Sequence, residues 1–126
     1  MLDRTDVDAR PYTSDVASAY AGADVFIFPT LEEGSPLVVY EAMASSLPIV
    51  TTPMGGGELV RHETDGFVVE PHDVGQLIDA IRRAASNRNA LDQMRRSARD
   101  RAQAFTWSSV GQRRANLLRS VLAMPA

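Results

Sequence analysis

The sequence predicts an α/β domain of the Rossmann-like, three-layer type, with a short parallel sheet and a helical C-terminal tail. Two apolar runs of strand length, at 25–28 and 49–51, are separated by a segment of helical length at 36–46. Strand, helix and strand in this order form a parallel βαβ unit. Because the first run is continuously apolar, we expect it to be covered on both faces.

The helix expected at 36–46 is the most informative stretch of the chain. Ser35 is a favourable N-cap, and Pro36 suits the first helical position, where a missing N–H costs nothing. The residues that follow are apolar on nearly every side, which predicts a helix buried all round. Glu41 is the only charge of this helix, about 7.5 Å along the axis from Pro36.

Two interpretations of Glu41 remain open. In the first, its carboxylate extends into solvent or pairs with an arginine of the fold. In the second, the carboxylate binds a ligand, because a phosphate at the helix N-terminus would meet free N–H groups and the positive end of the helix dipole. Glu41, one turn further along, would then accept hydrogen bonds from the hydroxyls of a sugar attached to that phosphate.

The segments on either side of this unit are less regular. Residues 1–12 show no clear period and are expected to be a poorly structured leader, and Thr13 or Ser14 would cap a short helix before the first strand. After the second strand, Gly55 and Gly56 permit positive φ and close approach to a ligand, although a flexible turn is an equal alternative. The loops at 30–35 and 53–57 follow the carboxyl ends of parallel strands, the edge where open α/β sheets bind ligands.

The C-terminal half predicts one short strand at 66–70 and three helices. Asp73 and Gln76 resemble a capping box, and the buried face of the helix that follows is expected to hold Val74, Leu77, Ile78, Ile81 and Ala85. The next helix opens at Asn87 or Asn89, and its arginines at 95, 96, 99 and 101 predict a solvated face. Thr106 caps a last helix over 106–122.

Composition excludes several classes of function. The length of 126 residues suits one compact domain, and the net charge of −3 argues against a nucleic-acid partner. There is no cysteine, the two histidines have no ligand spacing, and neither a metal nor a cofactor is expected. No apolar run approaches the ~20 residues of a membrane span, so a cytoplasmic location is the default expectation. All 13 basic residues are arginines.

Three strands form a small sheet with an open edge, which is a liability in an isolated domain. We therefore expect residues 1–126 to form a single partial domain. A missing N-terminal domain or a partner chain would cover the sheet edge.

An ordered series of motifs resembles a known family. Residues 33–44 read Glu33-Gly34-Ser35-Pro36-Leu37-Val38-Val39-Tyr40-Glu41-Ala42-Met43-Ala44, an E-x7-E element. It is preceded by Ala23–Thr30 and followed by Leu47-Pro48-Ile49-Val50, the Gly55-Gly56 loop, Asp65-Gly66-Phe67 and Phe105-Thr106-Trp107-Ser108. Over about residues 10–122, the chain resembles the C-terminal donor-binding domain of family 4 retaining glycosyltransferases of the GT-B fold.

The resemblance implies roles for the matched positions. Glu41 would bind the ribose hydroxyls of a nucleoside-diphosphate sugar, and the turn at Ser35, Pro36, Leu37 and Val38 would hold the diphosphate beside Gly34. Glu33 would face the transferred sugar and is the candidate catalytic residue. Gly55 and Gly56 would line the cleft.

The resemblance further implies transfer of the sugar to an unknown acceptor with retention, without a metal. Family members neutralise the leaving diphosphate with an arginine and a lysine from an earlier segment, and this chain holds no lysine. Because such cations supply much of the stabilisation of the transition state, we expect this chain alone to be inactive. A catalytically inactive, truncated module that binds a nucleotide or a partner is the alternative. Many family members dock on membranes through the N-terminal domain.

Overall fold

The computed structural model describes residues 6–123, so the first five residues of the predicted leader lie outside the described part. Residues 6–14 hold no helix or strand. The elements that follow are, in order, α1 (Val16–Ala21), β1 (Phe26–Phe28), α2 (Leu37–Ala44), β2 (Ile49–Thr51), the irregular helical turn η1 (Pro53–Gly57), β3 (Gly66–Val68), α3 (Val74–Ser86), α4 (Arg88–Ala102), the short turn η2 (Gln103–Phe105) and α5 (Trp107–Leu122).

The three strands form one parallel sheet in the order β1-β2-β3. Phe26 lies opposite Ile49, which lies opposite Gly66 on the other side. Helix α2 connects β1 to β2, which confirms the predicted βαβ unit. The two outer strands are shorter than predicted. The strand predicted at 25–28 covers only 26–28, and the strand predicted at 66–70 covers only 66–68.

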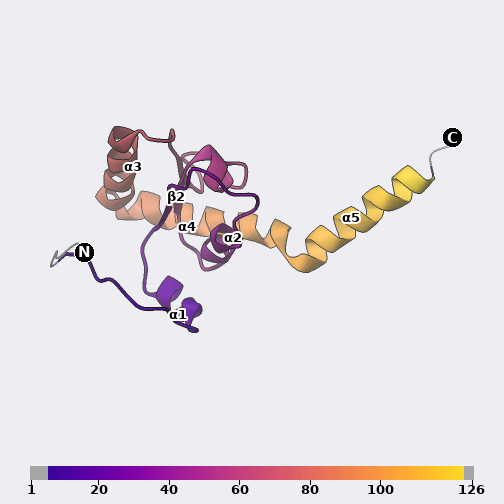
Figure 1. Cartoon of the computed structure of the whole chain (residues 1–126), viewed down its shortest axis with the longest axis horizontal. Coiled ribbons are helices and arrows are strands. Elements are labelled where there is room, and N and C mark those ends of the chain that lie inside the picture. Colours follow the sequence, from indigo (N-terminus) through magenta and orange to yellow (C-terminus); the bar gives the residue numbers. More distant parts are fainter. Residues whose placement is uncertain (1–5, 124–126) are drawn as a thin grey trace.

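Helices cover both faces of this sheet (Figure 1). Successive residues of β2 point to opposite faces, so Ile49 packs in one apolar cluster and Val50 in the other. The first cluster is built mainly from α2, and the second from β3 and α3. Helix α4 contributes to both, with Ala98 in the first cluster and Leu91 in the second. The fold is therefore held together by a helix that follows the sheet in sequence.

Helix α2 differs from its prediction in start and in burial. Its N-cap is Pro36, which makes no side-chain capping bond, so Ser35 is not the cap and the helix begins at Leu37. Val39, Ala42 and Met43 are buried, but Leu37 is 57% exposed. The expectation of burial all round is wrong for the described residues, because the sheet and α4 cover this helix on one side. An apolar helix face can be buried, but the sequence alone does not show that another element covers it.

Helix caps follow the sequence chemistry in most other places. Asp73 accepts a hydrogen bond from the Gln76 N–H (2.9 Å), as in the predicted capping box. Asn87, one of the two alternatives, caps α4, and Thr106 caps α5. Helix α1 is capped by Asp15 and not by Thr13 or Ser14, the two residues predicted.

The predicted buried face of α3 is largely wrong. Ala80 and Ala84 are buried, whereas Val74, Ile78 and Ile81 are exposed. The two alanines pack in the cluster that contains the large ring of Phe67. Small side chains allow the helix to approach that ring. Of the other predicted residues, Leu77 is half-buried and packs against this cluster, whereas Ala85 is exposed.

The solvated face predicted for the arginines of α4 is correct only in part, since Arg96 and Arg99 are exposed but Arg95 and Arg101 are half-buried. Arg95 donates to the Ala23 carbonyl (3.1 Å) and to the Asp24 carboxylate (2.8 Å). Arg99 donates to the carbonyl of Ala44 at 2.6 Å. A long guanidinium side chain can cross from its own helix to the loops of a packed neighbour. Arg95 therefore fastens α4 to the segment before β1, and Arg99 fastens it to the C-terminal end of α2.

Helix α5 extends away from the body of the domain (Figure 1). None of its described residues is fully buried, and Trp107 at its start is 80% exposed. Its base is fixed by the turn η2, where Arg113 donates to the Ala104 carbonyl at 2.6 Å.

Candidate functional site

A cleft of about 520 Å³ opens beyond the carboxyl ends of β1 and β2. We call it the glycine-loop cleft. Its lining consists of residues 33–36, 53–54 and 56–59 together with Tyr40 and Val68. Both loops expected at this edge of the sheet thus border one cleft, as predicted from their place after parallel strands.

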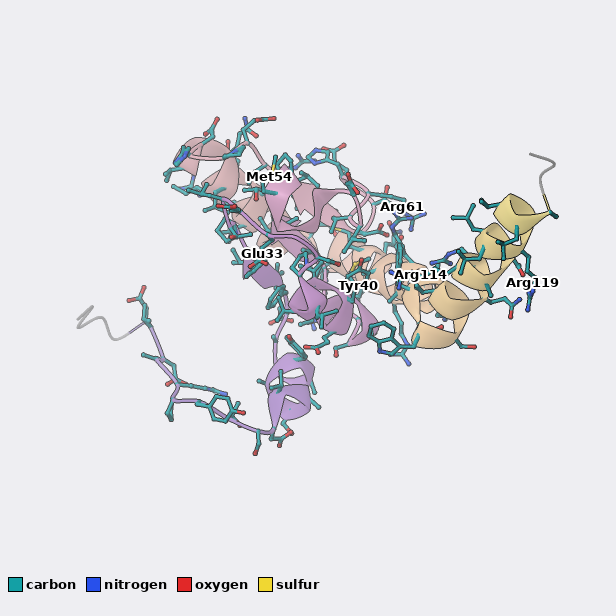
Figure 2. The ribbon with its side chains drawn as sticks, turned by 45° about the vertical axis from the view of Figure 1, so that its right-hand side comes forward. Glu33, Tyr40, Met54, Arg61, Arg114 and Arg119 are labelled. Atoms are coloured by element: carbon teal, nitrogen blue, oxygen red, sulfur yellow. The ribbon has the colours of Figure 1, made fainter. Side chains whose placement is uncertain are left out.

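A second cleft of about 250 Å³ lies between α2 and α5, and we call it the helix cleft. Its lining consists of Ser35, Leu37, Tyr40, Glu41, Phe105, Trp107, Val110 and Arg114. The two clefts meet at Ser35 and Tyr40, which line both. Figure 2 shows Tyr40 between Glu33 on one side and Arg114 of α5 on the other.

The predicted site residues divide between these clefts. Glu33, Gly34, Pro36 and Gly56 line the glycine-loop cleft. Leu37 and Glu41 line the helix cleft, and Ser35 lines both. Gly55 and Val38 line neither. The structure therefore places the two glutamates of the E-x7-E element in adjoining clefts, on either side of the α2 N-terminus.

The two glycines of the loop have different physical roles. Gly56 has φ of +94°, a left-handed conformation that L side chains rarely adopt. Gly55 is buried, and a Cβ on it would lie 2.2 Å from the Thr51 hydroxyl and 2.8 Å from the Phe28 carbonyl. Gly55 is thus required for close packing of the loop on the strands, while Gly56 shapes the cleft.

Threonine hydroxyls fasten this loop to its neighbours. The Thr51 hydroxyl lies 2.9 Å from the Phe28 carbonyl and 2.8 Å from the Gly55 carbonyl. The Thr52 hydroxyl donates to the Thr30 carbonyl and accepts from the Gly55 N–H at 3.2 Å. Because both hydroxyls bridge the loops after β1 and β2, the two sides of the cleft are held at a fixed separation.

The α2 N-terminus supplies neutral donors at the junction of the clefts. The first N–H groups of a helix have no acceptor within the helix. Pro36 makes no side-chain capping bond that would satisfy them. The Val39 N–H is an exception, since it bonds the Pro36 carbonyl at 3.1 Å. The N–H groups of Leu37 and Val38 thus form the positive end of the helix beside Ser35.

Glu41 is exposed, and it accepts a hydrogen bond from the Tyr20 hydroxyl at 3.4 Å. Partial burial and the negative charge of Glu41 raise the pKa of Tyr20, which keeps the phenol protonated as a donor. Tyr20 comes from α1, and its ring packs edge-on against Phe26 with 5.8 Å between centroids.

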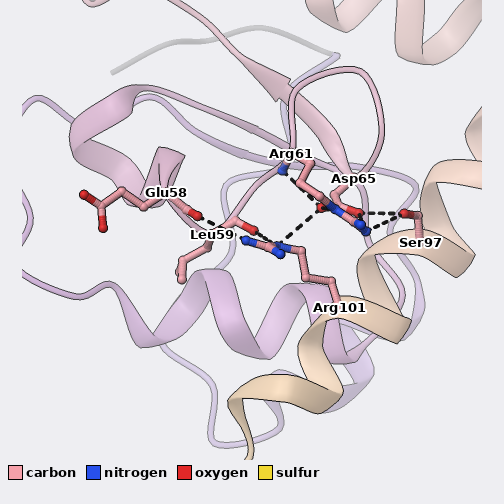
Figure 3. Close-up of polar contacts among 6 residues, drawn as sticks. All are labelled: Glu58, Leu59, Arg61, Asp65, Ser97 and Arg101. Atoms are coloured by element: carbon pink, nitrogen blue, oxygen red, sulfur yellow. Dashed lines mark hydrogen bonds and ion pairs between the residues drawn. The ribbon is translucent and has the colours of Figure 1, made fainter.

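A buried polar network behind the glycine-loop cleft was missed by sequence reasoning (Figure 3). Asp65 is 0% exposed and accepts bonds from the Arg61 N–H (3.0 Å), from the Arg61 guanidinium (2.7 and 2.8 Å) and from the Ser97 hydroxyl (2.7 Å). Burial raises the pKa of this carboxyl, but the bonds from Arg61 and Ser97 outweigh it, so the pKa lies below its usual value. The Asp65-Gly66 pair indicated only a turn in the sequence.

Residues 6–123 hold no group of three or more histidine, cysteine, aspartate or glutamate side chains that could hold a metal ion. No helix among them is long and apolar enough to cross a membrane.

Comparison with known proteins relates this geometry to a family. The model of the family described as "Glycosyl transferases group 1" matches residues 2–87. The chain is 32% identical over 91 residues to the UDP-Gal:alpha-D-GlcNAc-diphosphoundecaprenol alpha-1,3-galactosyltransferase of Escherichia coli, covering 71% of this chain and 23% of that protein.

Solved structures show the same relationship. Sucrose-phosphate synthase from Thermosynechococcus elongatus is 31% identical with a TM-score of 0.75, covering 86% of this chain and 28% of the other. Anabaena HepE in complex with UDP-glucose is 26% identical with a TM-score of 0.76, covering 86% and 31%. The chain thus spans roughly a quarter to a third of the proteins it resembles.

These matches confirm the predicted fold class, a Rossmann-like domain of the kind found at the C-terminus of GT-B glycosyltransferases. They also confirm the predicted resemblance. The chain belongs to the family of glycosyl transferases group 1.

Proposed function

We propose that this chain is the donor-binding part of a glycosyltransferase, which binds a nucleoside-diphosphate sugar for transfer to an acceptor with retention. The observation that carries the proposal is the placement of Glu33 and Glu41 in two clefts that meet at the α2 N-terminus. The proposal is supported by family membership and by the similar structure of Anabaena HepE, which has been solved in complex with UDP-glucose and with UDP.

In this proposal each part of the donor has a place. The diphosphate lies at the junction of the clefts, where the N–H groups of Leu37 and Val38 meet its negative charge. The ribose lies in the helix cleft, where Glu41 accepts hydrogen bonds from its hydroxyls. The transferred sugar lies in the glycine-loop cleft, facing Glu33 beside Gly56.

The charge of the glycine-loop cleft limits what this chain can do alone. Of the described residues that line it, Glu33 and Glu58 are the charged ones, and both are carboxylates. Departure of a nucleoside diphosphate builds up negative charge, which positioned cations normally stabilise. We therefore propose that the cations and the acceptor site belong to another segment, and that residues 1–126 alone are inactive.

The open edge of the sheet is where such a segment would join. Among the described residues, β1 pairs only with β2, and Ile27 in this strand is 43% exposed. An unpaired strand presents N–H and C=O groups to a further strand. We propose that an N-terminal domain or a partner chain covers this edge.

A second candidate function is a catalytically inactive module that binds a nucleotide or a partner. The acidic lining of the glycine-loop cleft favours it, because no described residue of that lining is a cation that could stabilise the leaving group of a transfer. Arg114 lines only the helix cleft. Sugar transfer by the chain joined to a segment that supplies cations would exclude this candidate.

The test of the proposed function is calorimetric titration of the chain with UDP, GDP and ADP. Glu41→Ala is the test variant. Glu32→Ala removes an exposed carboxylate from the same region that lines neither cleft, and is the matched control. We expect one nucleotide to bind, with about tenfold loss of affinity in Glu41→Ala, equivalent to about 1.4 kcal/mol, and no loss in Glu32→Ala. Equal affinity of Glu41→Ala and the parent chain would refute the proposed role of Glu41.

A further inference from the structure

We infer that Arg101 of α4 is a positioning residue, which fixes the wall of the glycine-loop cleft formed by Glu58 and Leu59. That this wall contacts the sugar of a nucleotide sugar rests on the proposed function. Arg101 itself lines neither cleft and lies behind the wall. It would act through the backbone of the two residues it contacts.

The contacts of Arg101 converge on one turn of the chain. Its guanidinium donates to the Leu59 carbonyl and to the Glu58 carbonyl, the latter at 3.2 Å. Its Nε also lies 3.6 Å from a carboxylate oxygen of the buried Asp65. Figure 3 shows the Glu58 side chain pointing away from Arg101, so the contact is with the backbone. The turn is thus held by its carbonyls while the Glu58 carboxylate stays free to face the cleft.

The buried carboxylate explains why a cation is stable in this position. The Arg101 side chain is 27% exposed, so its charge is partly removed from water. Asp65 offsets that charge, while Arg61 and Ser97 supply the closer hydrogen bonds to the carboxylate. The forked guanidinium can therefore direct its N–H groups to two successive carbonyls. A lysine ammonium lacks this planar fork.

Arg101 is also linked to Tyr40 through the aromatic ring of Phe105. Its guanidinium lies over the Phe105 ring, 5.5 Å from the centroid. Phe105 in turn packs edge-on against Tyr40, with 5.3 Å between centroids. Tyr40 lines both clefts. One side chain thus ties the turn at 58–59 to the residue that separates the two clefts.

The glycine loop gives this anchoring its importance. Three successive glycines, 55–57, precede Glu58, and glycine loses more conformational freedom on ordering than any other residue. The Leu59 N–H bonds the Gly56 carbonyl at 2.9 Å, so the position of Leu59 also fixes Gly56. Without Arg101, both the turn at 58–59 and Gly56 would lose their fixed positions.

The experiment compares Arg101→Met, Arg101→Lys and Ser97→Ala with the parent chain. Arg101→Met keeps most of the apolar stem and removes every donor. Ser97→Ala is the matched control, because Ser97 lies on the same helix and bonds Asp65 but does not contact the turn at 58–59. Affinities for UDP and for UDP-glucose are measured by calorimetry. Hydrogen exchange of the Leu59 amide is followed in the same four proteins.

We expect Arg101→Met to weaken binding of UDP-glucose about tenfold and binding of UDP far less, because charge-assisted hydrogen bonds to the sugar-side wall are lost. Exchange of the Leu59 amide should rise. Arg101→Lys should restore little of the affinity, because it lacks the fork. Ser97→Ala should lower thermal stability while leaving the ratio of the two affinities unchanged.

The outcomes separate this inference from the proposed function. If the parent chain binds UDP-glucose and Arg101→Met binds it equally well, the inference is overturned and the proposed function stands. If the parent chain binds neither ligand, the proposed function fails for uridine donors. The exchange measurement then decides whether Arg101 holds the wall. Equal exchange of Leu59 in Arg101→Met and Ser97→Ala would overturn that role.

Discussion

Replacement of Asp65 by alanine should remove a large part of the stability of the domain. The Arg61 N–H and the Ser97 hydroxyl would lose their acceptor, at about 1–2 kcal/mol each. The Arg61 guanidinium is half exposed and would turn to water, so its share is about 1 kcal/mol or less. Arg101 would keep its bonds to the backbone but lose its counter-charge. We therefore expect a loss of about 3–4 kcal/mol in the free energy of unfolding.

The assay is urea denaturation followed by circular dichroism at neutral pH. Asp79→Ala is the control, because Asp79 is an exposed carboxylate whose ion pair with Arg82 is 3.9 Å long. The control should change the free energy of unfolding by less than about 0.5 kcal/mol. If Asp65→Ala costs no more than the control, the network is not a stabilising feature, and the reasoning from burial and hydrogen bonds is refuted.

Three further predictions follow from particular contacts. Because the folded state lowers the pKa of Asp65, its contribution to the free energy of unfolding is present above its unfolded pKa of about 3.9 and is lost as pH falls through the lower folded value; urea titrations at pH 7 and pH 3 should show a larger loss in the parent chain than in Asp65→Ala, which keeps the lowered pKa values of Asp15 and Glu63. Gly66→Ala would place a Cβ 1.9 Å from a carbonyl of β2 at φ of +154°, so circular dichroism should show a largely unfolded chain, whereas Gly111→Ala, with open space around it, should stabilise α5 by up to about 1 kcal/mol. Tyr20→Phe should weaken nucleotide binding several-fold by removing the hydrogen bond to Glu41, and calorimetry should show no further loss when it is combined with Glu41→Ala.

The βαβ unit could be predicted from the sequence because its signals are local. The apolar runs at 25–28 and 49–51 have strand length, and the segment between them has helical length. The ends of the two predicted strands move by no more than a residue in the structure. Burial could not be predicted in the same way. Leu37 is apolar and exposed because nothing among the described residues covers it.

The side chains of α4 show why tertiary contacts escape sequence reasoning. Charges spread along a helix usually indicate a solvated face. Arg95 and Arg101 instead reach carbonyls 72 and 42 residues away in the chain. No local pattern encodes that distance. The contact between Tyr20 of α1 and Glu41 of α2 is likewise a product of the fold, which brings two separate helices together.

Some of the groups that hold the proposed ligand-binding residues in place lie outside the region that matches the family model. The family model matches residues 2–87, which include every predicted donor-binding residue. Helix α4 begins at Arg88, directly after this region, and supplies Leu91 and Ala98 to the two apolar clusters. It also supplies Arg101, which lies behind the wall of the glycine-loop cleft and donates to the carbonyls of Glu58 and Leu59. The matched region therefore contains the chemistry of the proposed site, and the geometry of that site depends on a helix outside it.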